Sequence, residues 1–191
     1  MYNKKQDLRV VKTKRLLYDT LIDLMKEMPF EEIKVSDICN RALINRSTFY
    51  SHYSDKYDLF SEYINDLKNT LTTSLENNRD YKDAREYYIE LISIFLNHVE
   101  DNREMYRLIL LNNKNSIVMD IVYDVLDNDI KKHIYEFDKN NKSVPIDIVT
   151  KFYLGAIFNV GIEYLNSEYK YTKEEIVRYI SLLIPREISN L

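Results

Sequence analysis

The sequence predicts an all-α protein of about nine helices, and three observations carry this prediction. Apolar residues recur at three- and four-residue spacing along almost the whole chain, as they do on the buried face of a helix. Two glycines and three prolines leave little turn chemistry for β-hairpins. No segment alternates apolar and polar residues over a length comparable with the helical patterns.

The first three helices are predicted within residues 17–53. One apolar face is formed by Leu17, Leu21, Leu24, Met25 and Met28, and Pro29 ends that helix. A short helix follows from Val35 to Ala42, with Ser36 as a candidate cap. Asn45 then caps a helix from Arg46 to Tyr53, which buries Phe49 and Tyr53.

Longer helices are predicted in the remainder of the chain. The next one opens at Ser54 or Asp55 and carries apolar residues as far as Leu71, before a polar break at 76–83. Further helices are expected at 84–100, 103–111, 116–137, 146–166 and 173–189. Thr172 and Glu175 form a capping box for the last of them.

The composition excludes several classes of protein. With 191 residues the chain can bury a core unaided. A single cysteine excludes a disulfide scaffold and a cysteine-ligated zinc site, and none of the three histidines lies four residues from another. A Gly-rich phosphate loop, a G-x-S-x-G elbow and an H-E-x-x-H motif are also missing from the sequence. We therefore expect no metal, no cofactor and no enzymatic activity.

No part of the chain is expected to enter a membrane. The first twenty residues are polar and basic, unlike a secretory signal. The longest mostly apolar stretch, 152–165, is shorter than a bilayer requires and contains Asn159 and Glu163. These observations predict a cytoplasmic protein without a membrane partner.

The charge is distributed unevenly between the two parts of the chain. Residues 1–56 carry a formal charge of +3, whereas residues 57–191 carry −7. A basic arm is predicted at residues 4–15, where six cations face one acidic residue, Asp7. Such an asymmetry is typical of a basic nucleic-acid-binding arm on an acidic body, although a solvated tail has the same composition.

The helix at 146–166 is apolar on two sides, and the last helix behaves similarly. Such a helix is buried on two sides, so one side needs a partner beyond the chain's own core. A second copy of the chain is the simplest partner, and a central core helix of the monomer is the alternative. The expected dimer interface consists of Leu154, Phe158, Ile162, Leu165, Ile176, Ile180 and Leu183.

Residues 35–53 are typical of a helix-turn-helix, because two short helices are joined by a tight turn and flanked by longer helices. In that arrangement the second helix enters the major groove of DNA. Arg46 can bind guanine bidentately, and Thr48 can contact thymine. Asn45 lies where the chain enters the groove. Contacts to phosphate are expected from Tyr50, His52 and Lys56, although His52 can equally pack against its tyrosine neighbours.

This region resembles the DNA-binding domain of TetR-family transcriptional regulators. The resemblance is carried by T-K-R-L-L-Y-D-T-L-I-D-L-M, V-S-D-I-C-N-R-A and I-N-R-S-T-F-Y-S-H-Y-S-D-K-Y-D-L, within residues 10–60. The rest of the chain matches only in helical layout, with a weaker resemblance to regulators related to activators of dihydroxyacetone kinase operons. Two positions depart from the family pattern: Leu43 replaces the usual turn glycine, and Lys34 replaces the usual threonine. A left-handed Leu43 costs about 1 kcal/mol, unless the turn is reshaped.

The resemblance implies the roles of individual residues. Contacts to bases or phosphates are implied for Lys34, Asn45, Arg46, Ser47, Thr48, Tyr50, His52 and Lys56. It also implies a helix-turn-helix domain at 1–56 and an effector-binding and dimerisation domain at 57–191. An effector pocket is expected among aromatic and polar side chains of the second domain, namely Tyr88, Phe95, Tyr106, Tyr123, Phe152 and Asn159. The same aromatic residues could instead form ordinary core.

The function implied is that of a homodimeric regulator, a repressor by resemblance, that binds an inverted repeat in double-stranded DNA. A small-molecule effector would alter its affinity for this operator. The alternative is a helical interaction protein that is controlled by a protein co-activator instead of a small molecule.

Overall fold

The computed structural model describes residues 8–77, 81, 84–111, 117–137, 144–166 and 170–184. Within these residues the chain is all-α, with nine α-helices and no strand, which confirms the predicted fold class. The elements in chain order are α1 (Leu8–Glu27), η1 (Phe30–Glu32), α2 (Val35–Ala42), α3 (Arg46–Tyr50), α4 (Lys56–Asn77), α5 (Ala84–Asp101), α6 (Arg103–Tyr106), the π-helical turn η2 (Arg107–Leu111), α7 (Ile117–Phe137), α8 (Ile146–Asn166) and α9 (Lys173–Leu183).

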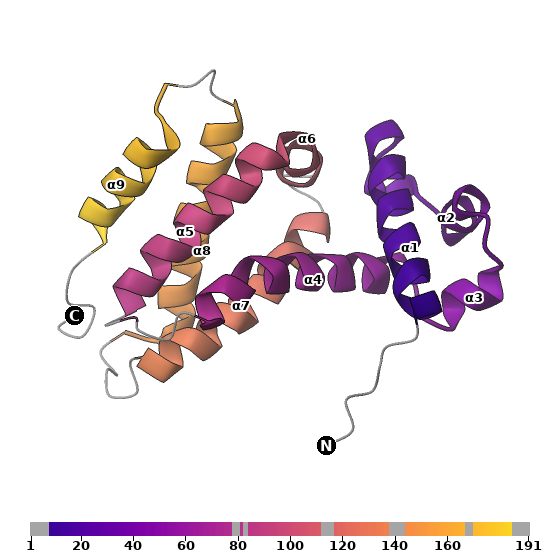
Figure 1. Cartoon of the computed structure of the whole chain (residues 1–191), viewed down its shortest axis with the longest axis horizontal. Coiled ribbons are helices and arrows are strands. Elements are labelled where there is room, and N and C mark those ends of the chain that lie inside the picture. Colours follow the sequence, from indigo (N-terminus) through magenta and orange to yellow (C-terminus); the bar gives the residue numbers. More distant parts are fainter. Residues whose placement is uncertain are drawn as a thin grey trace.

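The helices α1, α2 and α3 form a three-helix unit at one end of the molecule (Figure 1). Their shared core contains Leu17, Leu21, Leu24, Ile38 and Phe49, as the helical spacing predicts, together with Phe30 of η1. Burial of one such side chain contributes about 1.5–3 kcal/mol. The first turns of α4 close this core with Leu59 and Phe60, so α4 belongs to both parts of the molecule.

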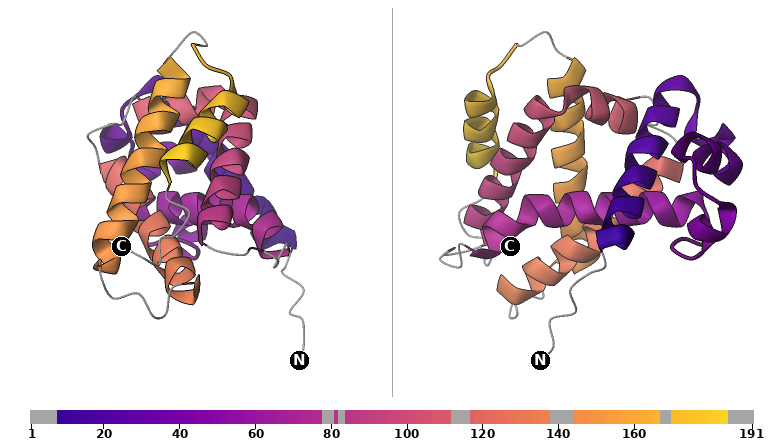
Figure 2. Two further views of the ribbon diagram at one scale, coloured as in Figure 1. Left: turned by 90° about the vertical axis from the view of Figure 1, so that its left-hand side faces the viewer. Right: turned by 45° about the vertical axis from the view of Figure 1, so that its right-hand side comes forward.

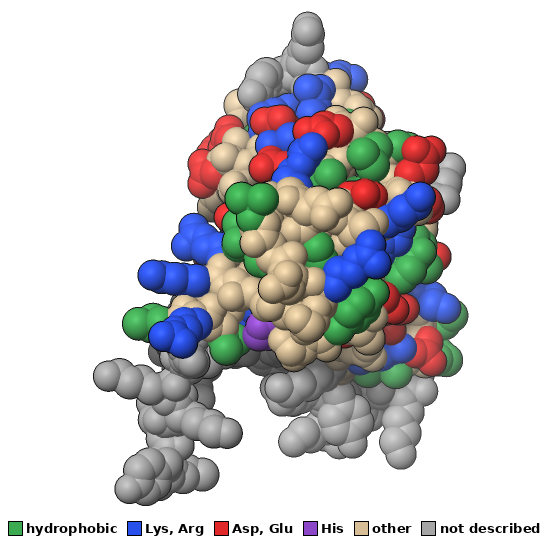
Figure 3. Space-filling view, turned by 90° about the vertical axis from the view of Figure 1, so that its right-hand side faces the viewer, with side chains coloured by type: hydrophobic (Ala, Val, Ile, Leu, Met, Phe, Trp, Pro, Cys, Tyr) green, Lys and Arg blue, Asp and Glu red, His purple; other side chains and the backbone are tan. Residues whose placement is uncertain are grey.

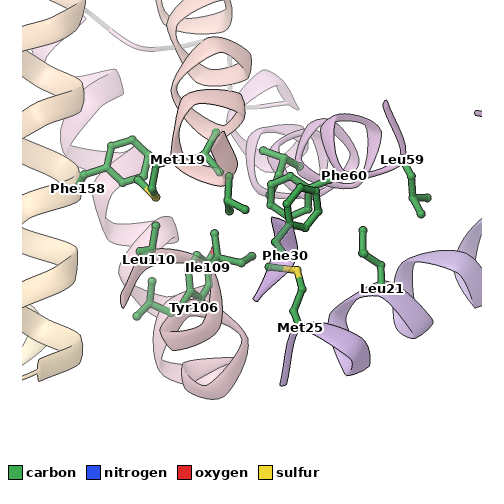
Figure 4. Packing of buried hydrophobic residues seen from close by; sticks show 14 of the residues in the cluster. Leu21, Met25, Phe30, Leu59, Phe60, Tyr106, Ile109, Leu110, Met119 and Phe158 are labelled. Carbon is green, nitrogen blue, oxygen red and sulfur yellow. The ribbon is translucent and has the colours of Figure 1, made fainter. Parts of the chain in front are cut away.

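The larger part is assembled around α4, which packs against α5 and α7. In turn α8 packs against α7 and α5, and α9 packs against α5 (Figure 2). One continuous core joins the two parts, because Met25, Phe30 and Phe60 belong to the same buried cluster as Tyr106 and Ile109 (Figure 4). The larger part therefore packs directly against the three-helix unit.

The first helix is longer than its apolar pattern predicts. It begins at Leu8, so the described part of the predicted basic arm is helical, while Lys4 and Lys5 lie outside the described residues. Polar contacts hold these early turns on α4: Lys14 pairs with Glu62, and the Tyr18 hydroxyl donates to Asp66 Oδ2 at 2.9 Å. Hydrophobic periodicity does not detect such contacts.

The helices α2 and α3 lie where the sequence predicts them, but their capping residues and the end of α3 differ from the prediction. Lys34, not Ser36, occupies the cap position of α2, and its backbone N–H donates to the Asp37 carboxylate at 2.9 Å. Asn45 occupies the cap position of α3, but its side chain makes no capping bond. The chain leaves α3 after Tyr50 instead of Tyr53, which nevertheless stays buried with its ring 5.9 Å from that of Phe49.

The capping box of α9 is confirmed. The backbone N–H of Glu175 donates to Thr172 Oγ1 at 3.2 Å, and the N–H of Thr172 donates to the Glu175 carboxylate at 2.9 Å. Arg85 of α5 donates to the carbonyls of Ser181 and Ile184 at the other end of this helix. Both ends of α9 therefore have partners for their backbone groups.

The helix α8 is longer than the apolar stretch that the sequence suggests. With 21 residues it is long and apolar enough to cross a membrane by length and composition alone, which corrects the expectation that it is too short. In this structure one side of α8 is buried against its neighbours, with Tyr153, Leu154, Phe158 and Leu165 among the residues that face the core. The apolar composition is thus accounted for on one side by core packing.

Candidate nucleic-acid interface and internal cavity

The helix α3 presents a polar surface at the end of the three-helix unit. Phe49 is fully buried and anchors α3, whereas Arg46, Ser47 and Tyr50 are exposed. Asn45 is exposed as well, and Thr48 is half-buried. Lys and Arg side chains flank a centre of mostly uncharged atoms on this face (Figure 3). The predicted base-contacting residues are therefore together and accessible.

Leu43 forms the turn between α2 and α3 in the left-handed conformation, with φ 55° and ψ 40°. The turn thus keeps the shape that a glycine would give it, and a leucine bears the conformational strain. The Leu43 side chain is 91% exposed and gains little from packing. Its N–H donates to the carbonyl of Asn40 at 3.4 Å, and the N–H of Ile44 donates to that of Cys39 at 3.1 Å.

An open hollow of about 400 Å³ lies between the start of α2 and α3. Three of the predicted DNA contacts line it with side chains that are exposed, namely Lys34, Arg46 and Tyr50, and Ser36 lies beside them. The first turn of α2, with its backbone N–H groups, also borders this hollow. The cationic side chains and the helix start favour an anion such as a backbone phosphate, whereas Asp55, which also lines the hollow, opposes one.

The structure contradicts the prediction that Lys56 contacts phosphate. The side chain is buried, and Nζ donates to the carbonyls of Phe30, Glu31 and Ile33 at 2.8, 2.7 and 2.8 Å. All three N–H donors of the ammonium group are thereby used within the protein. Nζ also lies 4.9 Å from the centre of the Phe30 ring. Lys56 therefore fastens the start of α4 to η1, immediately before α2.

For His52 the structure is compatible with both predicted roles, packing against a tyrosine and contact with phosphate. Its side chain is half-buried, and its ring centre is 6.2 Å from that of Tyr53. The packing alternative is thus present in the structure, and enough of the side chain is exposed for a phosphate contact to remain a prediction.

An internal cavity of about 90 Å³ lies between α4, α5, α6, η2, α7 and α8. Its lining is almost entirely hydrocarbon: Ile64, Leu67, Lys68, Leu71, Thr72, Leu91, Ile92, Phe95, Tyr106, Ile109, Leu110, Val122, Leu126, Ile130, Leu154, Ile157 and Phe158. Of the predicted pocket residues, Phe95 and Tyr106 line this cavity. The Tyr106 hydroxyl lies 3.1 Å from His98 Nδ1.

Four predicted pocket residues lie elsewhere. The ring of Tyr88 stacks on that of Tyr153 at 4.8 Å, and that of Tyr123 packs against Phe158 outside the lining. Phe152 is 70% exposed, and Asn159 is exposed with its side chain donating to the carbonyl of Gly155. The residues of α8 that line the cavity are instead Leu154, Ile157 and Phe158.

Four of the seven residues of the predicted dimer interface face the monomer's own core, so the prediction is wrong for them and stays a prediction for the other three. Leu154, Phe158 and Leu165 are buried within the monomer, as is Ile176, whereas Ile162 and Ile180 are partly buried. Of the predicted set only Leu183 is fully accessible. The exposed apolar side chains of these two helices are Ile148, Phe152, Tyr179, Leu182 and Leu183, which we call the α8/α9 apolar surface. Figure 2 (left) looks on to both helices.

The sequence matches known families over both parts of the chain. Residues 17–63 match the family of bacterial regulatory proteins named tetR, and residues 86–186 match a family described as the C-terminal region of transcriptional regulators. The chain belongs to the TetR family of transcriptional regulators. The second match covers more than half of the chain, including the cavity-lining helices other than α4.

Individual proteins resemble the chain in sequence or in fold. The transcriptional activator of the dhaKLM operon from Lactococcus lactis, DhaS, is 28% identical over 103 residues, which are 54% of this chain and 51% of that protein. The chain thus matches about half the length of this relative. A TetR regulator from Streptococcus agalactiae has a TM-score of 0.67 and 26% identity, covering 95% of this chain and 98% of that one. One from Syntrophomonas wolfei has a TM-score of 0.70 and 18% identity, covering 90% and 92%.

The family is one of transcriptional regulators, and its fold is that of the described chain. Among the described residues no group of three His, Cys, Asp or Glu side chains is arranged to hold a metal ion.

Proposed function

We propose that this TetR-family protein is a cytoplasmic regulator that binds an inverted-repeat operator as a homodimer, with residues 1–56 as the reading domain. The observation that carries this proposal is the exposed polar surface of α3, held by the buried Phe49 and bordered by cations. In a helix-turn-helix the start of the second helix meets the base edges. That start is formed here by Arg46 and Ser47.

Different residues of this surface have different tasks. Arg46 reads a base, because its guanidinium can pair bidentately with guanine. Lys34 contacts phosphate at the hollow between α2 and α3, in place of the buried Lys56. Tyr50 and His52 add phosphate contacts that set the register without carrying sequence information.

The test is fluorescence anisotropy of the protein titrated on to DNA from its own upstream region, with random DNA as control. Arg46→Ala is expected to cost about 1–3 kcal/mol on the operator and to relax specificity at one base pair. Lys34→Met is the matched variant, and it is expected to weaken operator and random DNA alike. Equal losses on both DNAs for both variants would contradict the assignment of Arg46.

The α8/α9 apolar surface is the proposed dimer contact. Phe152, Leu182 and Leu183 are each at least 70% exposed, and such exposed apolar side chains would be covered by a partner at an interface. Phe152→Glu combined with Leu183→Glu is expected to convert a dimer into a folded monomer in light-scattering measurements. Leu8→Glu is the matched control, because Leu8 is 73% exposed on α1, outside this surface. A wild-type monomer at micromolar concentration would refute the proposal.

An effector in the internal cavity is proposed to change the affinity for DNA. Five residues of α4 line the cavity, and the other end of α4 is fastened by Lys56 to the segment before α2. A ligand that displaces α4 therefore changes the placement of α2 and α3, provided that it binds the two states with different affinities. Repression is the proposed outcome of operator binding.

Activation is the second candidate, since DhaS is described as a transcriptional activator. In this version a protein co-activator docks on the helical domain in place of a small effector. A reporter gene under the upstream promoter separates the two, because deletion of a repressor raises expression and deletion of an activator lowers it.

A further inference from the structure

We infer that Leu43 is a specificity-determining residue of the DNA-binding surface, and that its side chain makes an apolar contact with the methyl group of a thymine. This inference rests on the proposed operator binding, and it adds to Arg46 a second residue that distinguishes one base from another. Neither the polar pattern of α3 nor the family resemblance assigns a contact with DNA to Leu43.

Nothing within the monomer favours a leucine at position 43. Its backbone is left-handed, with φ 55° and ψ 40°, a conformation that glycine adopts readily and that other residues resist. Among the described residues it is the only non-glycine residue with a positive φ. Its side chain is 91% exposed, so packing against the core does not offset this strain. Strained residues that persist in a structure cluster at functional sites.

The turn itself is held by backbone hydrogen bonds that do not involve the leucine side chain. The N–H of Ile44 donates to the carbonyl of Cys39 at 3.1 Å, and the N–H of Leu43 donates to that of Asn40 at 3.4 Å. Such bonds are typical of a helix that ends at a left-handed residue. The side chain at position 43 can therefore be changed while the path of the chain from α2 into α3 is kept.

Leu43 lies beside the start of α3, where a helix-turn-helix meets the base edges. The connection between α2 and α3 lies at the end of the molecule away from α8 and α9 (Figure 1). Asn45 and Arg46, which are both exposed, follow Leu43 by two and three residues. Three residues span at most about 11 Å, and successive base pairs are about 3.4 Å apart along DNA. We therefore expect the contacted thymine within about three base pairs of the base that Arg46 reads.

The thymine methyl group is the part of DNA that suits an aliphatic side chain. The base edges in the major groove offer hydrogen-bond donors and acceptors, which leucine cannot use, and one apolar group, the methyl group of thymine. Contact between this methyl group and Leu43 removes apolar surface of both from water. The phosphates to either side are charged and favour cations and hydrogen-bond donors instead. Leu43 thus favours thymine over cytosine and uracil, which lack the methyl group.

Replacement of single thymines by deoxyuridine tests this inference, because it removes the methyl group and keeps the base pair. The operator is selected from a random DNA pool by the full-length wild-type protein, and binding is measured by fluorescence anisotropy. At one thymine of a half-site, the replacement should raise the dissociation constant about fourfold, the value of one buried methyl-sized group. This thymine should lie within about three base pairs of the position at which Arg46→Ala relaxes specificity.

Variants assign the lost contact to Leu43, because Thr48 can also contact thymine. Leu43→Asn has a side chain of similar size that tolerates the left-handed backbone but is polar, and Leu43→Gly has no side chain. Both should bind the thymine and uracil operators equally, whereas Leu43→Met should retain at least a twofold preference for thymine. Thr48→Ser is the matched control: it removes a methyl group from α3 and should keep the fourfold difference. Thermal melting checks that each variant is folded.

The inference is overturned if no thymine in this range responds to the replacement, or if the response persists unchanged in Leu43→Gly and Leu43→Asn. The scan on the wild-type protein needs no variant, so a variant that fails to fold does not remove the test. Specific binding of the selected DNA without any effect of the methyl group refutes the role of Leu43 alone. A protein that selects no sequence from the pool refutes the proposed operator binding itself.

Discussion

Replacing Lys56 with methionine is expected to destabilise the protein without changing the salt dependence of DNA binding. The methionine keeps most of the apolar stem but cannot donate to the carbonyls of Phe30, Glu31 and Ile33. These carbonyls belong to the turn that leads into α2. The variant therefore separates a structural lysine from a phosphate-binding one.

The size of the effect follows from the contacts that are lost. A hydrogen bond from a charged donor contributes about 1.5–3 kcal/mol. The carbonyl of Phe30 retains a bond from the N–H of Ile33 at 3.2 Å, which reduces its loss. The attraction of Nζ to the Phe30 ring, about 0.5–1 kcal/mol, is lost as well. Burial lowers the pKa of Lys56, with Glu31 and Asp55 acting in the opposite direction, and this burial cost of the ammonium group is recovered. The net decrease in the free energy of unfolding is about 2–3 kcal/mol.

Urea unfolding measures this decrease as a shift of the midpoint at constant slope. Lys34→Met is the matched control, because Lys34 is exposed at the nearby hollow. The control should leave the midpoint unchanged and reduce the slope of log K against log salt by about 0.9. An unchanged midpoint for Lys56→Met together with a reduced salt slope would show that Lys56 binds phosphate and that the reasoning is wrong.

Three further predictions concern the turn, the half-buried His98 and the cavity wall. Leu43→Gly should stabilise the protein by about 0.5–1 kcal/mol in urea unfolding, because glycine removes the left-handed strain, whereas Leu43→Ala should give no gain. Burial lowers the pKa of His98 below 6.5, with Asp101 opposing, so the unfolded chain binds the proton first. Stability should therefore fall as the pH drops below about 6.5, and His98→Phe should flatten this part of the pH profile. An added Cβ at Gly161 would lie 3.0 Å from the Phe95 ring, so Gly161→Ala should push this ring into the cavity. Weaker binding of an apolar fluorescent dye in the cavity, with a melting temperature within a few degrees of wild type, would confirm that displacement.

The sequence was sufficient to predict the helix-turn-helix because its determinants are local. Spacing of Leu17, Leu21 and Leu24 sets the buried face of α1, and the break between Ala42 and Asn45 separates α2 from α3. The exposed polar residues of α3 follow from the burial of Phe49, since neighbours in a helix point in fixed relative directions. This local reasoning could not predict that the Lys56 side chain is buried, because its hydrogen-bond partners lie 23–26 residues away in the chain.

The sequence by itself determined the all-α class, the approximate ends of most helices and the family. Only the tertiary structure decided which side of α8 faces the core, turning Leu154 and Phe158 inward and Phe152 outward. Both sides of that helix are apolar, so periodicity gives two equally good solutions. The choice depends on the shapes of α5 and α7, against which α8 packs, and those shapes arise only when distant segments meet.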